Sequence, residues 1–190
     1  MARPPRPTRW GLTVAENAWP PRGAGPDDRA FVTRLLGREP LGEFEVMLRD
    51  PSGAPVVIHN SPVLRDGTPM PTRFWLVGAA ERKAVDRLEA AGGVREAEKA
   101  VDFEAIETAH RIYEAERQAE MPPRWGGPLP KGGVGGTRRG VKCLHAHYAW
   151  FLVGGPDPVG LWVARQLARA VGSGLPGDAG RADVAKAGSS

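Results

Sequence analysis

The stretch Phe44-Glu-Val-Met-Leu-Arg49, followed by Pro51-Ser-Gly53 and then by Val56-Val-Ile58, decides the fold of this chain. The first segment alternates apolar residues with others, which is the pattern of a half-buried β-strand. Its apolar positions are Phe44, Val46 and Leu48. The proline and glycine of the turn predict that residues 56–58 return as an antiparallel partner. Residues 73–77, Arg-Phe-Trp-Leu-Val, are expected to form a third strand.

The segments around this hairpin have apolar residues at helical spacing. A proline and two aspartates open the first of these segments, and Gly37 ends it. The expected helices span residues 26–36, 84–91, about 98–120 and 141–153, and a last one begins at Pro158. One small antiparallel sheet of about three strands, covered by four to five helices, is the simplest architecture for these elements. The sequence therefore predicts an α+β fold.

Length and composition predict one globular domain with tails. The chain has 190 residues, of which 41% are hydrophobic and 25% charged, as is usual for globular proteins. We expect residues 26–171 to form the domain, residues 1–25 a disordered Pro/Arg-rich arm, and residues 172–190 a flexible tail. No apolar run approaches the roughly 18 residues that span a bilayer. The single cysteine excludes an internal disulfide, so we expect a cytoplasmic protein with no membrane partner.

The high pI of about 9.6 comes mostly from the arm, where four arginines stand against Glu16. No motif of interleaved basic and aromatic residues accompanies this charge, so nucleic acid is an improbable partner. Trp10 and Trp19 lie in the same arm. Since exposed tryptophans often pack against a second molecule, a protein partner that binds residues 1–25 stays an open alternative.

Reactive side chains gather in Gly140-Val-Lys-Cys-Leu-His-Ala-His147, directly after the acid-free loop Lys131-Gly-Gly-Val-Gly-Gly-Thr-Arg-Arg139. If residues 141–153 form a helix, Cys143 and His147 share one face. If they form a strand, Cys143, His145 and His147 all point to one side. We expect the helix, because no turn interrupts the segment before Gly154-Gly155.

At the start of such a helix Cys143 becomes a candidate nucleophile, with His147 as its candidate base. The cationic loop before it is suited to holding a phosphate or carboxylate. Its candidate ligand-binding residues are Arg138, Arg139 and Lys142, with His145 beside them. The bland alternative is that the cysteine is a small buried hydrophobe.

Known cofactor motifs do not account for this segment. The glycine loop fits neither the P-loop nor the dinucleotide fingerprint. Cys143, His147 and a distant His59 or His110 are potential zinc ligands, but no pair of them has zinc-finger spacing. The sequence therefore predicts no metal site, and it identifies no cofactor.

A second set of candidates lies on the expected helix 98–120, where apolar residues lead into His110, Tyr113 and Arg117 at helical spacing. One interpretation is an amphipathic helix whose polar tips reach the edge of the domain. The other is that these three side chains line the wall of a ligand pocket.

The motif Lys142-Cys-Leu-His145, with Asp66-Gly-Thr-Pro-Met-Pro-Thr-Arg-Phe-Trp-Leu76 before it, resembles an uncharacterised, mainly actinobacterial family. It is known as domain of unknown function number five hundred and one, and the likeness covers roughly residues 28–170. Members often carry a histidine where this chain has Trp150. The family's genes tend to lie near those for a septum-formation initiator, an enolase and an exopolyphosphatase, which implies a loose link to division or phosphate metabolism.

Two functions follow as expectations. The first is binding of a small anionic ligand, phosphate or carboxylate, at the basic loop beside the Cys/His cluster. Catalysis at Cys143 would be an extension of it, and the sequence does not decide whether the protein is an enzyme. The alternative is a non-catalytic interaction protein linked to cell division, which binds a partner or nucleic acid through its basic arm.

Overall fold

A computed structural model of the chain describes residues 13–14 and 24–172. Most of the predicted disordered arm and of the predicted flexible tail lies outside these residues. The strands form one antiparallel sheet in the order β1-β2-β3-β4. They are β1 (Thr13–Val14), β2 (Phe44–Arg49), β3 (Pro55–Asn60) and β4 (Phe74–Leu76). The two-residue strand β1 pairs with β2 and falls within the range predicted as a disordered arm.

Six α-helices accompany the sheet in the part of the chain that the structure describes, so the predicted α+β class is confirmed. They are α1 (Pro26–Leu36), α2 (Ala79–Ala90), α3 (Gly93–Ala100), α4 (Phe103–Ala119), α5 (Leu144–Leu152) and α6 (Pro158–Gly172), with a short 3-10 turn η1 (Val134–Gly136). The first begins and ends where the sequence predicts: Pro26 occupies its first turn, and Gly37 ends it with a left-handed φ of 70°. None of the described helices combines the length and the apolar character needed to cross a membrane.

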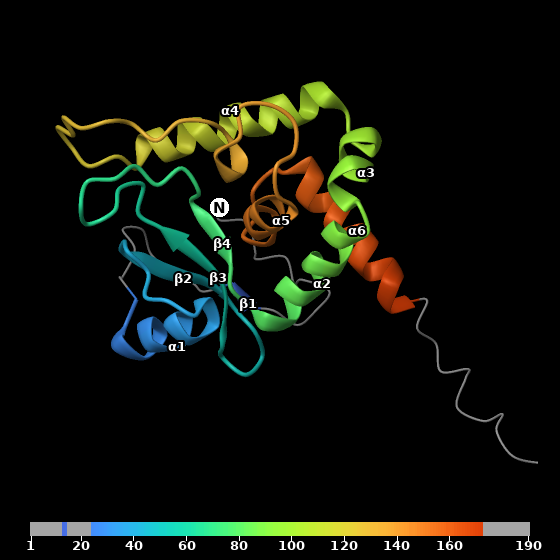
Figure 1. Ribbon diagram of the computed structural model, residues 1–190, viewed down its shortest axis with the longest axis horizontal. Coiled ribbons are helices and arrows are strands. Elements are labelled where there is room, and N and C mark those ends of the chain that lie inside the picture. Colours follow the sequence, from blue (N-terminus) through green and yellow to red (C-terminus); the bar gives the residue numbers. More distant parts are fainter. Residues whose placement is uncertain (1–12, 15–23, 173–190) are drawn as a thin grey trace, which may run out of the picture.

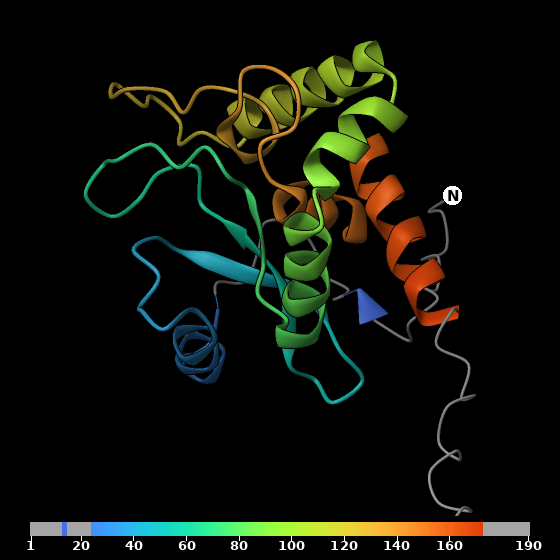
Figure 2. The same cartoon turned by 45° about the vertical axis from the view of Figure 1, so that its right-hand side comes forward.

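Helices cover the sheet on both faces, with α1 on one side and α2 to α6 on the other (Figures 1 and 2). Val32 of α1 packs with Phe44, Val46 and Ile58 in a small core. A larger core joins the opposite face of the sheet to the remaining helices. The prediction that β2 is half-buried is therefore wrong, because neither of its faces is left to solvent.

A β-bulge at Met47 changes which face β2 presents. Val46 pairs with Ile58 and Leu48 with Val57, so β2 advances two residues while β3 advances one. As a result Val46 lies in the small core with α1, whereas Leu48 lies in the large core on the other face. The alternation expected for Phe44, Val46 and Leu48 on one face is broken at this point.

Three of the expected helices have bounds that differ from the prediction. The helix expected over residues 84–91 already begins at Ala79. The expected helix 98–120 is divided, because Val101 is extended and Asp102 caps α4 by accepting a hydrogen bond from the N–H of Ala105. The expected helix 141–153 begins only at Leu144. Cys143 is its N-cap residue, with an extended backbone (φ −152°, ψ 120°), and so precedes the first turn.

Buried charged residues join the sheet to α4. His59 lies 3.1 Å from Glu45 on β2 and 3.0 Å from Glu120 at the end of α4. The guanidinium of Arg73 pairs with Glu120 and with Glu116. Burial alone would lower the pKa of His59, but its hydrogen bonds with Glu120 and Glu45 outweigh burial and raise it. This network forms the interior contact between the hairpin and α4.

Candidate functional site

A pocket of about 420 Å³ lies beside the edge strand β4, and residues of α2 and of the start of α5 help to line it. Figure 1 shows both helices near β4. Its wall contains the cysteine and one histidine of the predicted reactive segment, together with two arginines. The lining residues that bear on its chemistry are Arg38, Arg82, Asp86, Gly135, Cys143 and His145. We take this pocket as the candidate functional site.

The thiol of Cys143 is half-buried and faces an imidazole. Its Sγ lies 3.7 Å from Nδ1 of His145. The extended backbone of Cys143 explains this pairing, since an N-cap residue does not follow the spacing of the helix behind it. The cysteine is therefore not sealed in the core. The helical spacing had predicted His147 as its partner, but the imidazole beside it is that of His145.

Two carboxylates of α2 complete the surroundings of His145. Oδ1 of Asp86 lies 3.0 Å from Nε2 of the imidazole, and Oε1 of Glu89 lies 3.3 Å from Nδ1. The same oxygen of Glu89 accepts a hydrogen bond of 2.6 Å from the backbone N–H of Leu144. Glu89 thus satisfies the first free amide of α5, a group that a helix start otherwise offers to an anion.

These neighbours favour the protonated form of His145. Desolvation lowers the pKa of this histidine, but the hydrogen bond with Cys143 and the charges of Cys143, Glu89 and Asp86 outweigh it. The pKa rises to about 9. At neutral pH the imidazole is therefore cationic and lies directly beside the sulfur atom.

Arg38 and Arg82 supply further positive charge at the pocket. Arg82 donates a hydrogen bond to the backbone oxygen of Leu35, and Arg38 stacks over the ring of Trp75. Within the described part of the chain, neither guanidinium lies within 4.0 Å of a carboxylate. Two cations without a counter-ion thus face the space beside Cys143.

The basic residues predicted as anion ligands lie elsewhere. Arg138, Arg139 and Lys142 are exposed, and none of them lines the pocket. The guanidinium of Arg139 stacks over the ring of Phe103 at the start of α4. The loop contributes to the pocket through Gly135 instead. The structure therefore does not bring Arg138, Arg139 or Lys142 into the pocket that Cys143 lines.

His147, the predicted base, is buried and points away from the pocket. Its Nδ1 donates to Oδ2 of Asp157 over 2.7 Å, and Oδ1 of the same aspartate accepts from the N–H of Gly160 at the start of α6. The other ring nitrogen, Nε2, is buried without a hydrogen-bond partner among the residues that the structure describes. The His147–Asp157 pair joins α5 to the start of α6.

The predicted stripe on α4 is real, but its members are inside the protein and bind the chain itself. His110 accepts from the N–H of Val134, so its Nε2–H donates to the oxygen of Gly140. Arg117 is fully buried and donates to the oxygens of Pro71, Pro130 and Gly132.

The third member of the stripe, Tyr113, accepts hydrogen bonds from the N–H groups of Arg73 and Phe74. Burial raises the pKa of Tyr113 to about 12. The stripe therefore reaches neither the edge of the domain nor the pocket beside β4. Its side chains hold the loops before β4 and before α5 against α4.

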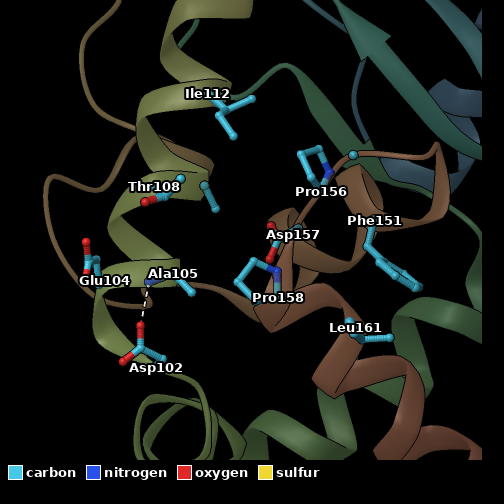
Figure 3. Close-up of a pocket in the computed structure, with 12 residues that line it drawn as sticks. Asp102, Glu104, Ala105, Thr108, Ile112, Phe151, Pro156, Asp157, Pro158 and Leu161 are labelled. Carbon is cyan, nitrogen blue, oxygen red and sulfur yellow. Dashed lines mark hydrogen bonds between the residues drawn. The ribbon is translucent and has the colours of Figure 1, made fainter.

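A second pocket of about 620 Å³ lies between α4 and the start of α6. Ile112, Phe151 and Leu161 are among the residues that line it, and Figure 3 shows Asp102 accepting the hydrogen bond from Ala105 that caps α4. Asp157 also lies on its wall, but both carboxylate oxygens of this residue already accept hydrogen bonds. The second pocket is thus mainly apolar, and it contains no cysteine or histidine.

Sequence reasoning missed four residues of the site: Arg38, Arg82, Asp86 and Glu89. The last two stand three apart on one helix, and this spacing placed two carboxylates on one face. That signal was available in the sequence. Their contacts with the start of α5 were not, because Glu89 accepts a hydrogen bond from the N–H of Leu144, 55 positions further along the chain.

Comparison with known proteins identifies a family but no activity. The family model described as protein of unknown function (DUF501) matches residues 46–165, a shorter stretch than the likeness over roughly residues 28–170. No curated protein and no solved structure matches the chain.

Proposed function

Because the chain belongs to the family described as DUF501, whose function is unknown, its role has to come from its own residues, and we propose that it binds a small anionic ligand, a phosphate or a carboxylate, in the pocket beside β4. The free thiol is typical of a protein in a reducing compartment, so this function would belong to the cytoplasm.

The observation that carries the proposal is a pair of arginines that line the pocket, Arg38 and Arg82, neither of which has a counter-ion among the residues that the structure describes. Guanidinium groups are planar, carry a permanent charge and present several donors, so they bind phosphate and carboxylate oxygens in pairs of hydrogen bonds. The two carboxylates nearby do not compete for them, because both lie against His145. A bound anion would therefore neutralise the positive charge of these two guanidinium groups.

The stacking of Arg38 on Trp75 and the hydrogen bond from Arg82 to Leu35 also limit the movement of both side chains. A cation held in one orientation loses less conformational entropy when it binds a ligand. Gly135 also lines this pocket, so the backbone of the glycine loop would offer a further contact to the anion.

A thermal-shift screen at matched ionic strength tests the proposal, with inorganic phosphate, citrate and a set of phosphorylated and carboxylate metabolites as probes. A ligand at 100 times its Kd stabilises the protein by about 2.7 kcal/mol. For a chain of this size each kcal/mol raises Tm by about 2–4 °C. The expected shift is therefore about 5–11 °C at saturation.

Two double variants separate the alternatives. Arg38→Ala/Arg82→Ala should abolish the shift, whereas Arg138→Ala/Arg139→Ala, which removes the same charge from exposed positions, should retain it. Loss of the shift only in the second variant would move the site to the glycine loop. Equal shifts in wild type and both variants would reject an arginine-bound anion altogether.

A further inference from the structure

Beyond anion binding, we infer that Glu89, Cys143 and His145 form the binding site of a divalent zinc-type metal ion. Their ligand atoms all lie within 4.8 Å of one another. They come from two helices that the fold packs together, because Glu89 lies on α2 and the other two residues form the start of α5. The inference rests on these three side chains and does not depend on the arginines of the pocket.

The distances fit a tetrahedral centre. With Zn–S near 2.3 Å and Zn–N near 2.0–2.1 Å, a sulfur and a nitrogen ligand lie roughly 3.6 Å apart, and a nitrogen and an oxygen ligand roughly 3.4 Å apart. The protein has 3.7 Å between Cys143 Sγ and His145 Nδ1, and 3.3 Å between that nitrogen and Glu89 Oε1. Two of the three distances between ligand atoms therefore already match those of a tetrahedral zinc site.

The second nitrogen of His145 has the partner that metal-bound histidines usually have. Asp86 Oδ1 lies 3.0 Å from Nε2, so Nε2–H donates to a carboxylate while Nδ1 faces the other two ligands. This carboxylate–histidine–metal arrangement fixes the ring and makes its free nitrogen a better ligand. Glu89 is held in a similar way by the N–H of Leu144.

The ligand types indicate which metal would bind. Sulfur, imidazole and carboxylate together suit Zn²⁺, whereas Mg²⁺ and Ca²⁺ prefer oxygen ligands alone. When the ion binds, the cysteine thiol and the imidazolium each lose a proton to the solvent, and the metal takes the place of both protons.

Three protein ligands leave one tetrahedral position for a water molecule or a ligand atom, which is the coordination of catalytic rather than structural zinc. Cys143 and His145 both line the pocket beside β4, so this fourth position has space on the pocket side. A buried structural site would instead have a fourth side chain.

Metal binding is tested on the full chain after removal of metals with a chelator. Titration with Zn²⁺ against a chelating dye should give one ion per chain. Co²⁺ should give a thiolate-to-metal absorption band that Cys143→Ser abolishes. Asp86→Asn keeps all three ligands and removes only the charge behind the histidine, so it should weaken Zn²⁺ affinity about 10–100-fold.

The controls separate this result from anion binding and from misfolding. Arg38→Ala/Arg82→Ala should leave Zn²⁺ affinity unchanged, and circular dichroism should show Cys143→Ser and Asp86→Asn folded as in wild type. If Cys143→Ser binds Zn²⁺ as tightly as wild type, or if no stoichiometric binding occurs, the metal site is wrong. Either result would leave the anion proposal untouched, because its test depends on other residues.

Discussion

Asp86 and Cys143 lie on opposite sides of the His145 ring, the first 3.0 Å from Nε2 and the second 3.7 Å from Nδ1. The imidazole thus connects an exposed carboxylate of α2 with the half-buried thiol that precedes α5. This relationship joins the two elements that form the candidate site.

The Asp86→Asn variant should titrate His145 at a lower pH in metal-free protein. Wild type should show the ring proton signals of this histidine moving with a midpoint of about 9, against an ordinary pKa of 6.5. Losing the Asp86 charge removes one of the contributions that raise it. Two-dimensional NMR across pH 5–10 measures the midpoint, and an unchanged midpoint would contradict the contact.

The sign of this shift also predicts a stability difference. A raised pKa in the folded protein contributes stability that is complete below pH 6.5 and is lost as the pH rises through about 9. Wild type should therefore exceed Asp86→Asn in free energy of unfolding at pH 6, and the difference should disappear above pH 9. Urea unfolding at both pH values measures it.

The His145→Asn variant should slow alkylation of Cys143 by iodoacetamide at pH 7, in the presence of a chelator. A cationic imidazole 3.7 Å from the sulfur stabilises the reactive thiolate, and removing it should cost on the order of 10-fold or more in rate. The chain has one cysteine, so mass spectrometry follows a single reaction. Lys142→Ala removes an exposed neighbouring cation and should change the rate little. Equal slowing in both variants would exclude a specific role for His145.

The Arg117→Met variant should destabilise the protein by about 3 kcal/mol or more, because the backbone oxygens of Pro71 and Gly132 lose a fully buried donor and that of Pro130 loses one of its two donors. Gln118→Ala is a matched control, because Gln118 donates one longer bond of 3.3 Å to the same oxygen of Pro130. It should cost less than about 1 kcal/mol. Urea midpoints compare the two, and a small loss for Arg117→Met would mean that water replaces the guanidinium.

The Glu120→Gln variant should lose most stability in a limited pH window. Burial raises the pKa of Glu120, but the hydrogen bonds with His59 and Arg73 outweigh burial, so it lies below 4.5. Its contribution is present above pH 4.5 and is lost as the pH falls through the folded pKa. The raised pKa of His59 sets the upper end of this pH window. The contribution of His59 to stability is complete below pH 6.5 and is lost as the pH rises through the pKa of His59 in the folded protein.

The penalty for Glu120→Gln should therefore be largest between about pH 4.5 and 6.5. Unfolding curves between pH 4 and 9 measure it. Glu116→Gln removes the more exposed partner of Arg73 and should give a smaller penalty that depends less on pH. A penalty of the same size at every pH would contradict the coupling of His59 to Glu120.

The local sequence pattern predicted which segments form helices and strands, but not on which face of the sheet the side chains pack. The alternation in residues 44–49 and the turn after it predicted the β2–β3 hairpin, and Pro26 and Pro158 marked two helix starts. The bulge at Met47 depends on how β2 pairs with β3, so no periodicity in one strand could reveal it. The same bulge explains why Leu48 packs on the opposite face from Val46.

The sequence singled out the segment around Cys143, but not the residues that surround it. The helix expected over residues 141–153 starts three residues later, at Leu144, and with this shift His145 and not His147 lies beside the sulfur. Helix spacing is reliable inside a helix and fails at the cap, where the backbone is extended. Arg38 and Arg82 reach the pocket through tertiary packing alone.

Glu89 binds the backbone of α5 and faces the sulfur and the imidazole with the same carboxylate oxygen. The space for the proposed ion would therefore depend on how closely α2 packs against α5, because Glu89 comes from the first helix and the other two ligands from the second. A shift of α2 relative to α5 would change the size of ion that fits.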